Sequence, residues 1–237
     1  MKMSFTLPSA LALAALLVGC QQNGEEAATG SAPNPSANRP ASTAEAKLTP
    51  LPGKEGTAPA LTEVTTVRLA TTAGDVLIEV YPQAAPNAAK RFIELARSGF
   101  FDDTPISRVV PGFVAQFGVN WREPHKAWKD REFVDDPGFF ALERGTLAFA
   151  KSGQPNSAST QVFINYRENN RLADPSPQLS FWVFGKVVEG MDVVDKFVQV
   201  GDSSGGLDQG RLWADGGAYL ESLPVKPTMI EKASIVQ

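Results

Sequence analysis

The sequence has very little of the side-chain chemistry from which many enzymes build their active sites. Its 237 residues include one cysteine, Cys20, and one histidine, His125. A disulfide framework, a zinc site of cysteine and histidine ligands, and a cysteine nucleophile in the folded region are therefore excluded. His125 lies in the polar segment 121–130 without ligand-spaced partners. We interpret it as a solvent-facing loop residue rather than a metal ligand, and we predict no metal site.

Strong charge of one sign and long apolar runs are also missing. The formal net charge is −4, and the basic residues form no stripe, so nothing predicts binding to nucleic acid. The apolar segment 10–18 is too short to span a membrane permanently. Hydrophobic residues nevertheless make up 43% of the chain, which is ample for a packed core.

The N-terminus has the pattern of an export signal, in which positive charge precedes a short apolar core and small residues. The ending Leu17-Val18-Gly19-Cys20 resembles the lipobox of bacterial lipoproteins. That resemblance implies removal of residues 1–19 and lipidation of Cys20; an ordinary secretory peptide that ends in cysteine is the alternative. Gln21 resembles the pattern sorted to the outer membrane in Gram-negative bacteria, which implies an anchored protein that faces the periplasm.

Residues 20–60 have the composition of a tether rather than of a folded domain. After the cysteine they are rich in Ala, Pro, Ser, Gly, Asn, Thr and Glu, with almost no large apolar side chains. Such a segment cannot bury enough surface to offset its ordering entropy. We therefore predict a disordered tether over 20–60 and a single folded domain over 61–237.

The folded part has many short strands and few helices. Two strands are expected around the turn Thr72-Ala73-Gly74, and a helix is expected from Pro86 to Gly99. The hairpin strands are expected at 64–70 and 75–81, and two short strands in 107–118 are expected to turn at Pro111-Gly112. The later strands are expected at 145–150, 161–166, 181–188 and 228–236. A second helix is expected at 191–200. This order predicts a mostly β protein, an antiparallel barrel capped by two α-helices.

A single arginine stands inside the apolar stretch 107–118, which reads SRVVPGFVAQFG. Phe113 and Gln116 follow Arg108 at intervals of five and three residues. Arginine keeps its charge and has five donors to satisfy, so this position is unfavourable unless the guanidinium has a function. The alternative is an arginine on a strand face, with its stem packed, its head solvated and plain core residues around it.

Five collinear segments resemble the cyclophilins, which are peptidyl-prolyl cis-trans isomerases, and most closely their exported bacterial branch. Together they cover essentially Val64 to the C-terminus, and the resemblance implies a closed eight-stranded barrel with a helix at each end. It also implies isomerisation of X-Pro peptide bonds with no cofactor. The segments are GDVLIEVYPQAAPNAAKRFIELARSGFFDDT (74–104), SRVVPGFVAQ (107–116), GTLAFA (145–150), NSASTQVFIN (156–165) and VFGKVVEGMDVVDK (183–196).

The resemblance also implies the roles of individual residues. Arg108 matches the catalytic arginine, and Gln116 matches the glutamine that binds substrate backbone and helps to aim it. Phe113 matches a catalytic position in the proline pocket. The remaining matches are substrate-binding positions: Val114, Phe163 and Leu172 in the pocket, Gln161 beside it, and Phe181 on its rim.

Four residues depart from the family pattern. Ser107 stands where many members carry histidine, and Phe181 replaces a histidine or tyrosine, which removes a polar group from the rim. Phe117 replaces a small residue, and we expect it to alter the floor near Gln116. Arg171 falls where several members have tryptophan or phenylalanine, which predicts weak inhibition by cyclosporin.

Gly201–Gly206 reads GDSSGG and resembles the GDSGG around the nucleophile of chymotrypsin-like proteases. It has an extra serine, and His125 lacks that family's signature, so a catalytic triad is not expected. We interpret the segment as a flexible loop after the second helix. A hydrolase that uses these serines is one alternative function.

The leading hypothesis is a monomeric, membrane-tethered isomerase that acts on proline-containing exported polypeptides. A second alternative is a binding module that holds such segments in the same groove without useful turnover. Arg108, Phe113 and Gln116 together favour the enzyme over this module.

Overall fold

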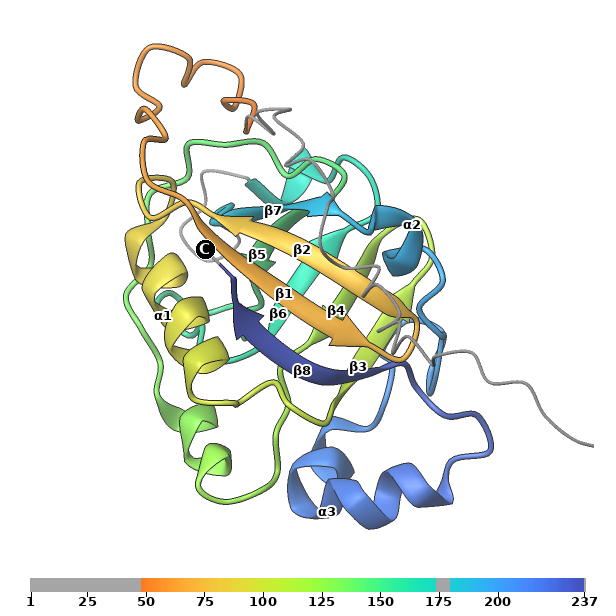
Figure 1. The fold of residues 1–237 in the computed structure, drawn as a ribbon. Helices are drawn as coiled ribbons and strands as arrows, with labels where there is room; N and C mark the ends of the chain where they lie inside the picture. Colours follow the sequence, from red (N-terminus) through yellow and green to blue (C-terminus); the bar gives the residue numbers. More distant parts are fainter. Residues whose placement is uncertain (1–47, 174–179, 237) are drawn as a thin grey trace, which may run out of the picture. The chain divides into compact units, whose positions relative to one another are not determined.

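The computed structural model describes residues 48–173 and 180–236, and in this part eight strands form a closed antiparallel barrel. Around the barrel the strands follow the order β1-β2-β7-β5-β6-β4-β3-β8 (Figure 1), which confirms the predicted architecture. Cys20 and the predicted signal peptide lie outside the described residues. The strands are β1 (Thr65–Thr71), β2 (Gly74–Val80), β3 (Thr104–Val110), β4 (Val114–Phe117), β5 (Thr146–Phe149), β6 (Val162–Asn165), β7 (Gly185–Glu189) and β8 (Met229–Ile235).

Strands β1 and β2 form the predicted hairpin, and β1 also pairs with β8 to close the barrel. The side chains of both hairpin strands alternate between the two faces, as the period of two requires. Val67, Leu69, Val76 and Ile78 point inward and are buried in the main core. The apolar alternation in the sequence therefore fixes which face of the sheet becomes the interior.

Helix α1 (Pro86–Arg97) closes one end of this core. Pro86 occupies the first helical turn, where its missing N–H is no loss. The buried face of the helix includes Phe92, whose ring lies 5.3 Å from Phe101 and 5.1 Å from Phe184. Figure 1 shows α1 and the short helix α2 (Met191–Val194) on opposite sides of the barrel.

The other helices differ from the prediction. The helix expected over 191–200 has only four residues, and a 14-residue helix, α3 (Gln209–Ser222), was not predicted. Asp215 breaks α3 into two pieces, and the following Gly216 packs so closely on Trp121 that a Cβ would lie 2.3 Å from the ring. Gly216 is thus needed for tertiary packing, because a side chain at this position would collide with Trp121.

The folded domain begins earlier than residue 61. Leu48 is 5% exposed in a second apolar cluster, which lies on the outer face of the barrel. The Leu51 N–H donates to the Phe139 carbonyl (2.8 Å), and Pro50 forms an antiparallel bridge with Phe140. The assignment of 48–60 to the tether is therefore wrong. We call residues 48–61 the strap; one buried leucine and the hydrogen bonds of a few residues are enough to hold it on the domain.

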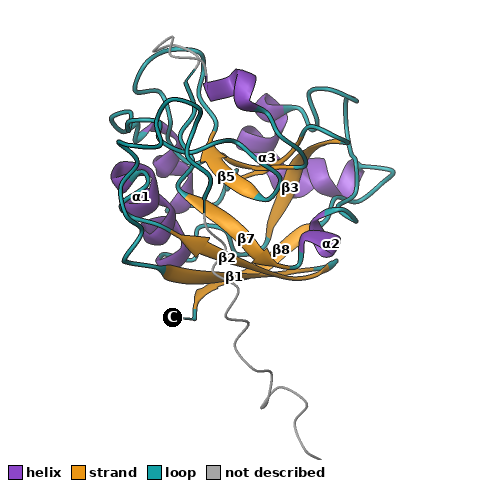
Figure 2. Ribbon diagram, turned by 90° about the horizontal axis from the view of Figure 1, so that it is seen from above, coloured by secondary structure: helices purple, strands orange, loops and turns teal. Residues whose placement is uncertain are grey.

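Smaller differences concern the ends of elements. The strand expected from 181 begins only at Gly185, and the long loop 119–141 contains a 3-10 helix, His125–Asp130. A second 3-10 turn, Asn170–Ala173, follows β6. Figure 2 shows the helices and loops around the barrel from above. Among the described residues, no helix is long and apolar enough to cross a membrane.

Candidate active site on the outer face of the barrel

Four neighbouring strands present one row of side chains on the outside of the barrel. Arg108 of β3 pairs with Gln116 of β4, Gln116 pairs with Phe163 of β6, and Phe163 pairs with Ala148 of β5. Residues paired directly across a sheet point to the same face, so these side chains are neighbours. The adjacent residues of each strand point into the core instead: Val109, Ala115, Ile164 and Leu147.

The polar end of this row is a chain of hydrogen bonds. Arg108 Nη1 donates to Gln116 Oε1 (3.3 Å), and Gln116 Nε2 donates to Gln161 Oε1 (2.8 Å). The Gln116 amide is thereby oriented, since its oxygen accepts from Arg108 and its nitrogen donates to Gln161. The structure brings together all three polar residues that the sequence singled out, with Gln116 in contact with the arginine.

A loop that sequence reasoning treated as flexible holds Arg108 from the other side. Arg108 Nε donates to the Ser204 carbonyl (2.6 Å), a charge-assisted hydrogen bond. Gly206 lies against β3 so closely that a Cβ would be 2.7 Å from the Arg108 Cα. The segment Gly201–Gly206 is a loop, as predicted, and it contacts the site through the Ser204 carbonyl and Gly206.

Asp202 closes this loop on itself. One of its carboxylate oxygens accepts hydrogen bonds from the Ser204 and Gly205 N–H groups and from the Ser204 hydroxyl, each at 2.8 Å. The backbone N–H of Ser204 is the main reason why the pKa of Asp202 falls to about 2. Because these donors occupy the carboxylate, the loop presents its Ser204 carbonyl to Arg108. A backbone acceptor of this kind leaves no signal in the sequence.

The apolar residues that match the proline pocket lie in the outer cluster, beside the arginine. Val114 (2% exposed) and Phe163 (4% exposed) are the buried ones among them. The partly buried side chains of Phe113, Leu172 and Phe181 pack against that cluster. The Phe181 ring meets the Phe163 ring edge-on, with 5.5 Å between their centroids. The backbone N–H of Phe181 donates to the Leu172 carbonyl (3.1 Å). All five apolar residues expected from the sequence are therefore brought together here.

Phe113 has two cations over its ring. The guanidinium carbon of Arg108 lies 5.7 Å from the ring centroid, and that of Arg171 lies 5.4 Å from it. The Phe113 carbonyl accepts from the Tyr166 N–H (2.9 Å) and from Asn169 Nδ2 (3.2 Å). Asn169, which no sequence pattern singled out, thus anchors the aromatic residue Phe113 through its backbone.

Phe117 does not form part of the site floor. It is 0% exposed and points into the barrel, where its ring lies 5.4 Å from that of Phe101. The expectation that it would alter the floor near Gln116 is wrong, because adjacent strand residues face opposite sides. Gln116 points outward, so the larger side chain of Phe117 is accommodated by the core and not by the pocket.

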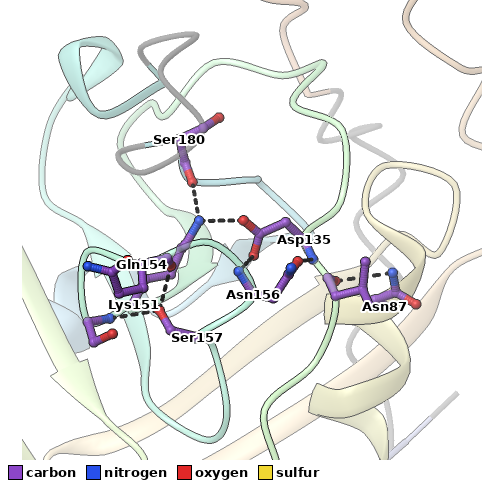
Figure 3. A network of polar contacts seen from close by, with 9 residues as sticks. Asn87, Asp135, Lys151, Gln154, Asn156, Ser157 and Ser180 are labelled. Atoms are coloured by element: carbon purple, nitrogen blue, oxygen red, sulfur yellow. Dashed lines mark hydrogen bonds and ion pairs between the residues drawn. The ribbon is translucent and has the colours of Figure 1, made fainter.

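A buried ion pair between Lys151 and Asp135 belongs to a network of polar contacts that reaches Ser180 (Figure 3). The Lys151 side chain is 0% exposed, and its ammonium lies 2.6 Å from an Asp135 carboxylate oxygen and 4.5 Å from the centre of the Trp182 ring. Nζ also lies 3.5 Å from the Ser180 carbonyl, directly before Phe181. The other Asp135 oxygen accepts from the Asn156 N–H (2.8 Å). Lys151 thus connects three loops around the pocket.

The serines of the GDSSGG loop do not form a triad. Across residues 48–173 and 180–236, neither Ser203 nor Ser204 hydrogen-bonds His125. The His125 ring packs edge-on against Phe100 at 5.9 Å, and its Nδ1 atom is buried. His125 is partly exposed, so the interpretation of it as solvent-facing holds only for part of the side chain. Within the described residues, nothing in its surroundings is a metal ligand set.

What this arrangement can do follows from its donors. The contacts to Ser204 and Gln116 use two of the five guanidinium N–H donors and leave three for a bound molecule. The pocket next to them accepts an apolar ring.

A family model for cyclophilin type peptidyl-prolyl cis-trans isomerase/CLD matches residues 66–215. The chain belongs to this family. It is a cyclophilin-type peptidyl-prolyl cis-trans isomerase.

Curated relatives agree with this assignment. The chain is 38% identical over 148 residues to a peptidyl-prolyl cis-trans isomerase of Acinetobacter baylyi, covering 61% of this chain and 78% of that one. It is 33% identical over 180 residues to peptidyl-prolyl cis-trans isomerase A of Dickeya dadantii, covering 75% and 88%. A Cryptosporidium parvum cyclophilin structure matches with a TM-score of 0.54 at 23% identity, covering 74% and 99%, and this likeness concerns the fold.

Arg171 predicts weak inhibition of this cyclophilin by cyclosporin. Its guanidinium stands over Phe113 where several family members present an aromatic side chain to the drug. We expect inhibition far weaker than nanomolar in an isomerisation assay of the purified protein. Arg171→Trp should strengthen inhibition, since it supplies the missing indole. Nanomolar inhibition of the unmodified protein would contradict the prediction.

Proposed function

We propose that this cyclophilin is a monomeric isomerase of the cell envelope, which speeds X-Pro interconversion in exported polypeptides, and that Arg108 stabilises the twisted amide. Uncatalysed X-Pro isomerisation takes tens to hundreds of seconds, so it can limit the folding of an exported chain. The proposal for Arg108 rests on one observation, the contacts from Ser204 and Gln116 that fix its guanidinium beside the apolar pocket.

The mechanism needs no proton transfer and no covalent intermediate. The barrier to rotation, about 18–20 kcal/mol, comes from amide resonance. In the twisted state the prolyl nitrogen regains a localised lone pair, and a donor held near that nitrogen stabilises the twisted form more than either planar form. Phe113 and Phe163 would hold the proline ring while the flanking chain turns. Gln116 would bind the substrate backbone and keep the arginine aimed.

The test of the Arg108 role is to measure isomerisation and peptide binding for the full chain and its Arg108→Ala variant. A prolyl peptide followed by NMR exchange reports the isomerisation rate, and a titration of the same peptide reports affinity. The proposal requires the variant to keep binding while its rate falls. Equal rates for the two proteins would exclude a catalytic role for Arg108 and leave a site that binds proline-containing segments.

The envelope location rests on the N-terminal pattern that ends at Cys20. Each buried methylene of an acyl chain contributes about 0.8 kcal/mol, so several chains hold a protein firmly on a bilayer. A Gram-negative host should incorporate labelled fatty acid into the protein and retain it in the outer-membrane fraction. Cys20→Ser should abolish the labelling and release the protein. Unmodified protein found in the soluble periplasmic fraction would favour the ordinary secretory peptide instead.

A further inference from the structure

A cavity of about 870 Å³ adjoins the proline pocket on the side of Arg171. It is within the usual size range of ligand sites. The strap contributes Leu51 and Lys54 to its wall, and Phe139 connects it to the outer apolar cluster that contains the proline pocket. A polypeptide whose proline occupies that pocket would therefore continue past Arg171 into this cavity. Part of its wall therefore comes from the segment that the composition assigned to the tether.

The two carboxylates in the wall of the cavity are already paired. Asp135 forms the buried ion pair with Lys151 and accepts from Asn156. Asp136 is 5% exposed and accepts from the N–H groups of Asn87 and Ala88 at 3.1 and 2.8 Å, at the N-terminus of α1. A helix N-terminus carries partial positive charge, which compensates this carboxylate. Neither carboxylate is therefore left to attract a cation.

The two cations in the wall, in contrast, form no ion pair with a described residue. Lys54 and Arg171 are exposed, and neither makes an ion pair with another described residue. Arg171 reaches back over the Phe113 ring, so it stands at the junction between the proline pocket and the cavity. Arg108 adds a third positive charge at the same ring. Among the described residues, the charges left unpaired between the proline pocket and the cavity are thus positive.

From this charge pattern we infer that the site selects proline-containing polypeptides with Asp or Glu close to the proline, and that Arg171, assisted by Lys54, is the specificity-determining residue. The inference rests on the proposed function at the same site and names its substrate class. An aspartate or glutamate that enters the cavity gains two unpaired cations, whereas a lysine meets the same two as like charges. Long-range attraction between exposed charges is screened by salt, so the preference depends on ionic strength.

The experiment compares prolyl peptides that differ in one residue, Glu, Gln or Lys, placed on either side of the proline. NMR exchange gives kcat/KM, and titration gives affinity, for the full chain at about 0.01 M and about 1 M salt. For one of the two placements we expect the Glu peptide to exceed the Gln peptide by about fivefold at low salt, as for an exposed ion pair worth about 1 kcal/mol. The Lys peptide should be the poorest.

Arg171→Gln and Lys54→Gln, alone and combined, should reduce the Glu-to-Gln ratio towards one. Arg97→Gln removes the same charge from the exposed end of α1 and should leave the ratio unchanged. Equal values for Glu and Gln peptides in both placements would overturn the inference, as would a ratio that survives the double variant. A chain that binds the Glu peptide selectively but isomerises none would refute the proposed function and leave the acidic preference standing.

Discussion

Replacing Arg108 by alanine should lower kcat/KM for proline isomerisation by about 10²–10³-fold. Removal of one preorganised donor from a site of developing charge has an effect of this size in other enzymes. The variant loses the guanidinium that Ser204 and Gln116 hold in place, while the apolar pocket of Phe163 and Val114 remains. We therefore expect the loss in kcat, with a much smaller change in the dissociation constant of a prolyl peptide.

Two further variants separate charge from geometry. Arg108→Lys keeps the charge but loses the planar fork that contacts both Ser204 and Gln116, so it should recover only part of the activity. Arg97→Ala removes an arginine from the exposed end of α1 and should have no effect. If Arg108→Ala and Arg97→Ala were equally active, or if the Arg108 variant lost affinity while kcat stayed unchanged, differential stabilisation of the twisted amide would be wrong.

The row of side chains that forms the site could be predicted because it depends on local rules. Strand alternation places Arg108 and Gln116 on one face, and a turn at Pro111-Gly112 pairs them. The same alternation places Phe117 in the core. Applying this rule to Phe117 would have removed the one wrong expectation about the floor.

The supports of the site could not be predicted, because they depend on tertiary contacts between groups with no distinctive pattern. Ser204 contributes only a backbone carbonyl, which any residue in that loop conformation would supply. Leu48 is a single apolar residue in a polar segment, and its burial becomes evident only when the outer cluster is assembled. Asn169 acts through an amide to the Phe113 backbone. Such contacts are set by the assembled fold rather than by composition or periodicity.

Lys151 is the strongest example of a tertiary contact without a sequence pattern. Replacing it should lower the free energy of unfolding of the domain by about 3–5 kcal/mol. It follows β5 in a polar loop, yet its side chain is fully buried against Asp135 and Trp182. Lys151→Met keeps much of the apolar volume but leaves the Asp135 carboxylate, 20% exposed, without its cation. Urea unfolding followed by fluorescence gives the free energy of unfolding for both proteins.

A matched control is available in another ion pair of the same chain. Lys196 lies 3.3 Å from Asp192, one helical turn away, and both side chains are largely exposed. Lys196→Met should change the free energy of unfolding by less than about 1 kcal/mol, because exposed ion pairs contribute little. A Lys151→Met variant no less stable than this control would mean that desolvation already offsets the buried pair.

The double variant Lys151→Met/Asp135→Asn tests whether the two charges act as a pair. The asparagine amide keeps an acceptor for the Asn156 N–H, so the double variant removes both charges without losing that contact. Its destabilisation should be smaller than the sum of the single effects by more than 1 kcal/mol, roughly the coupling of groups in direct contact.

Because the ammonium also lies 3.5 Å from the Ser180 carbonyl, releasing Ser180 should loosen Phe181 on Phe163. We therefore expect the variants that fold to bind prolyl peptides more weakly while kcat changes little, which distinguishes support of the pocket from the role of Arg108.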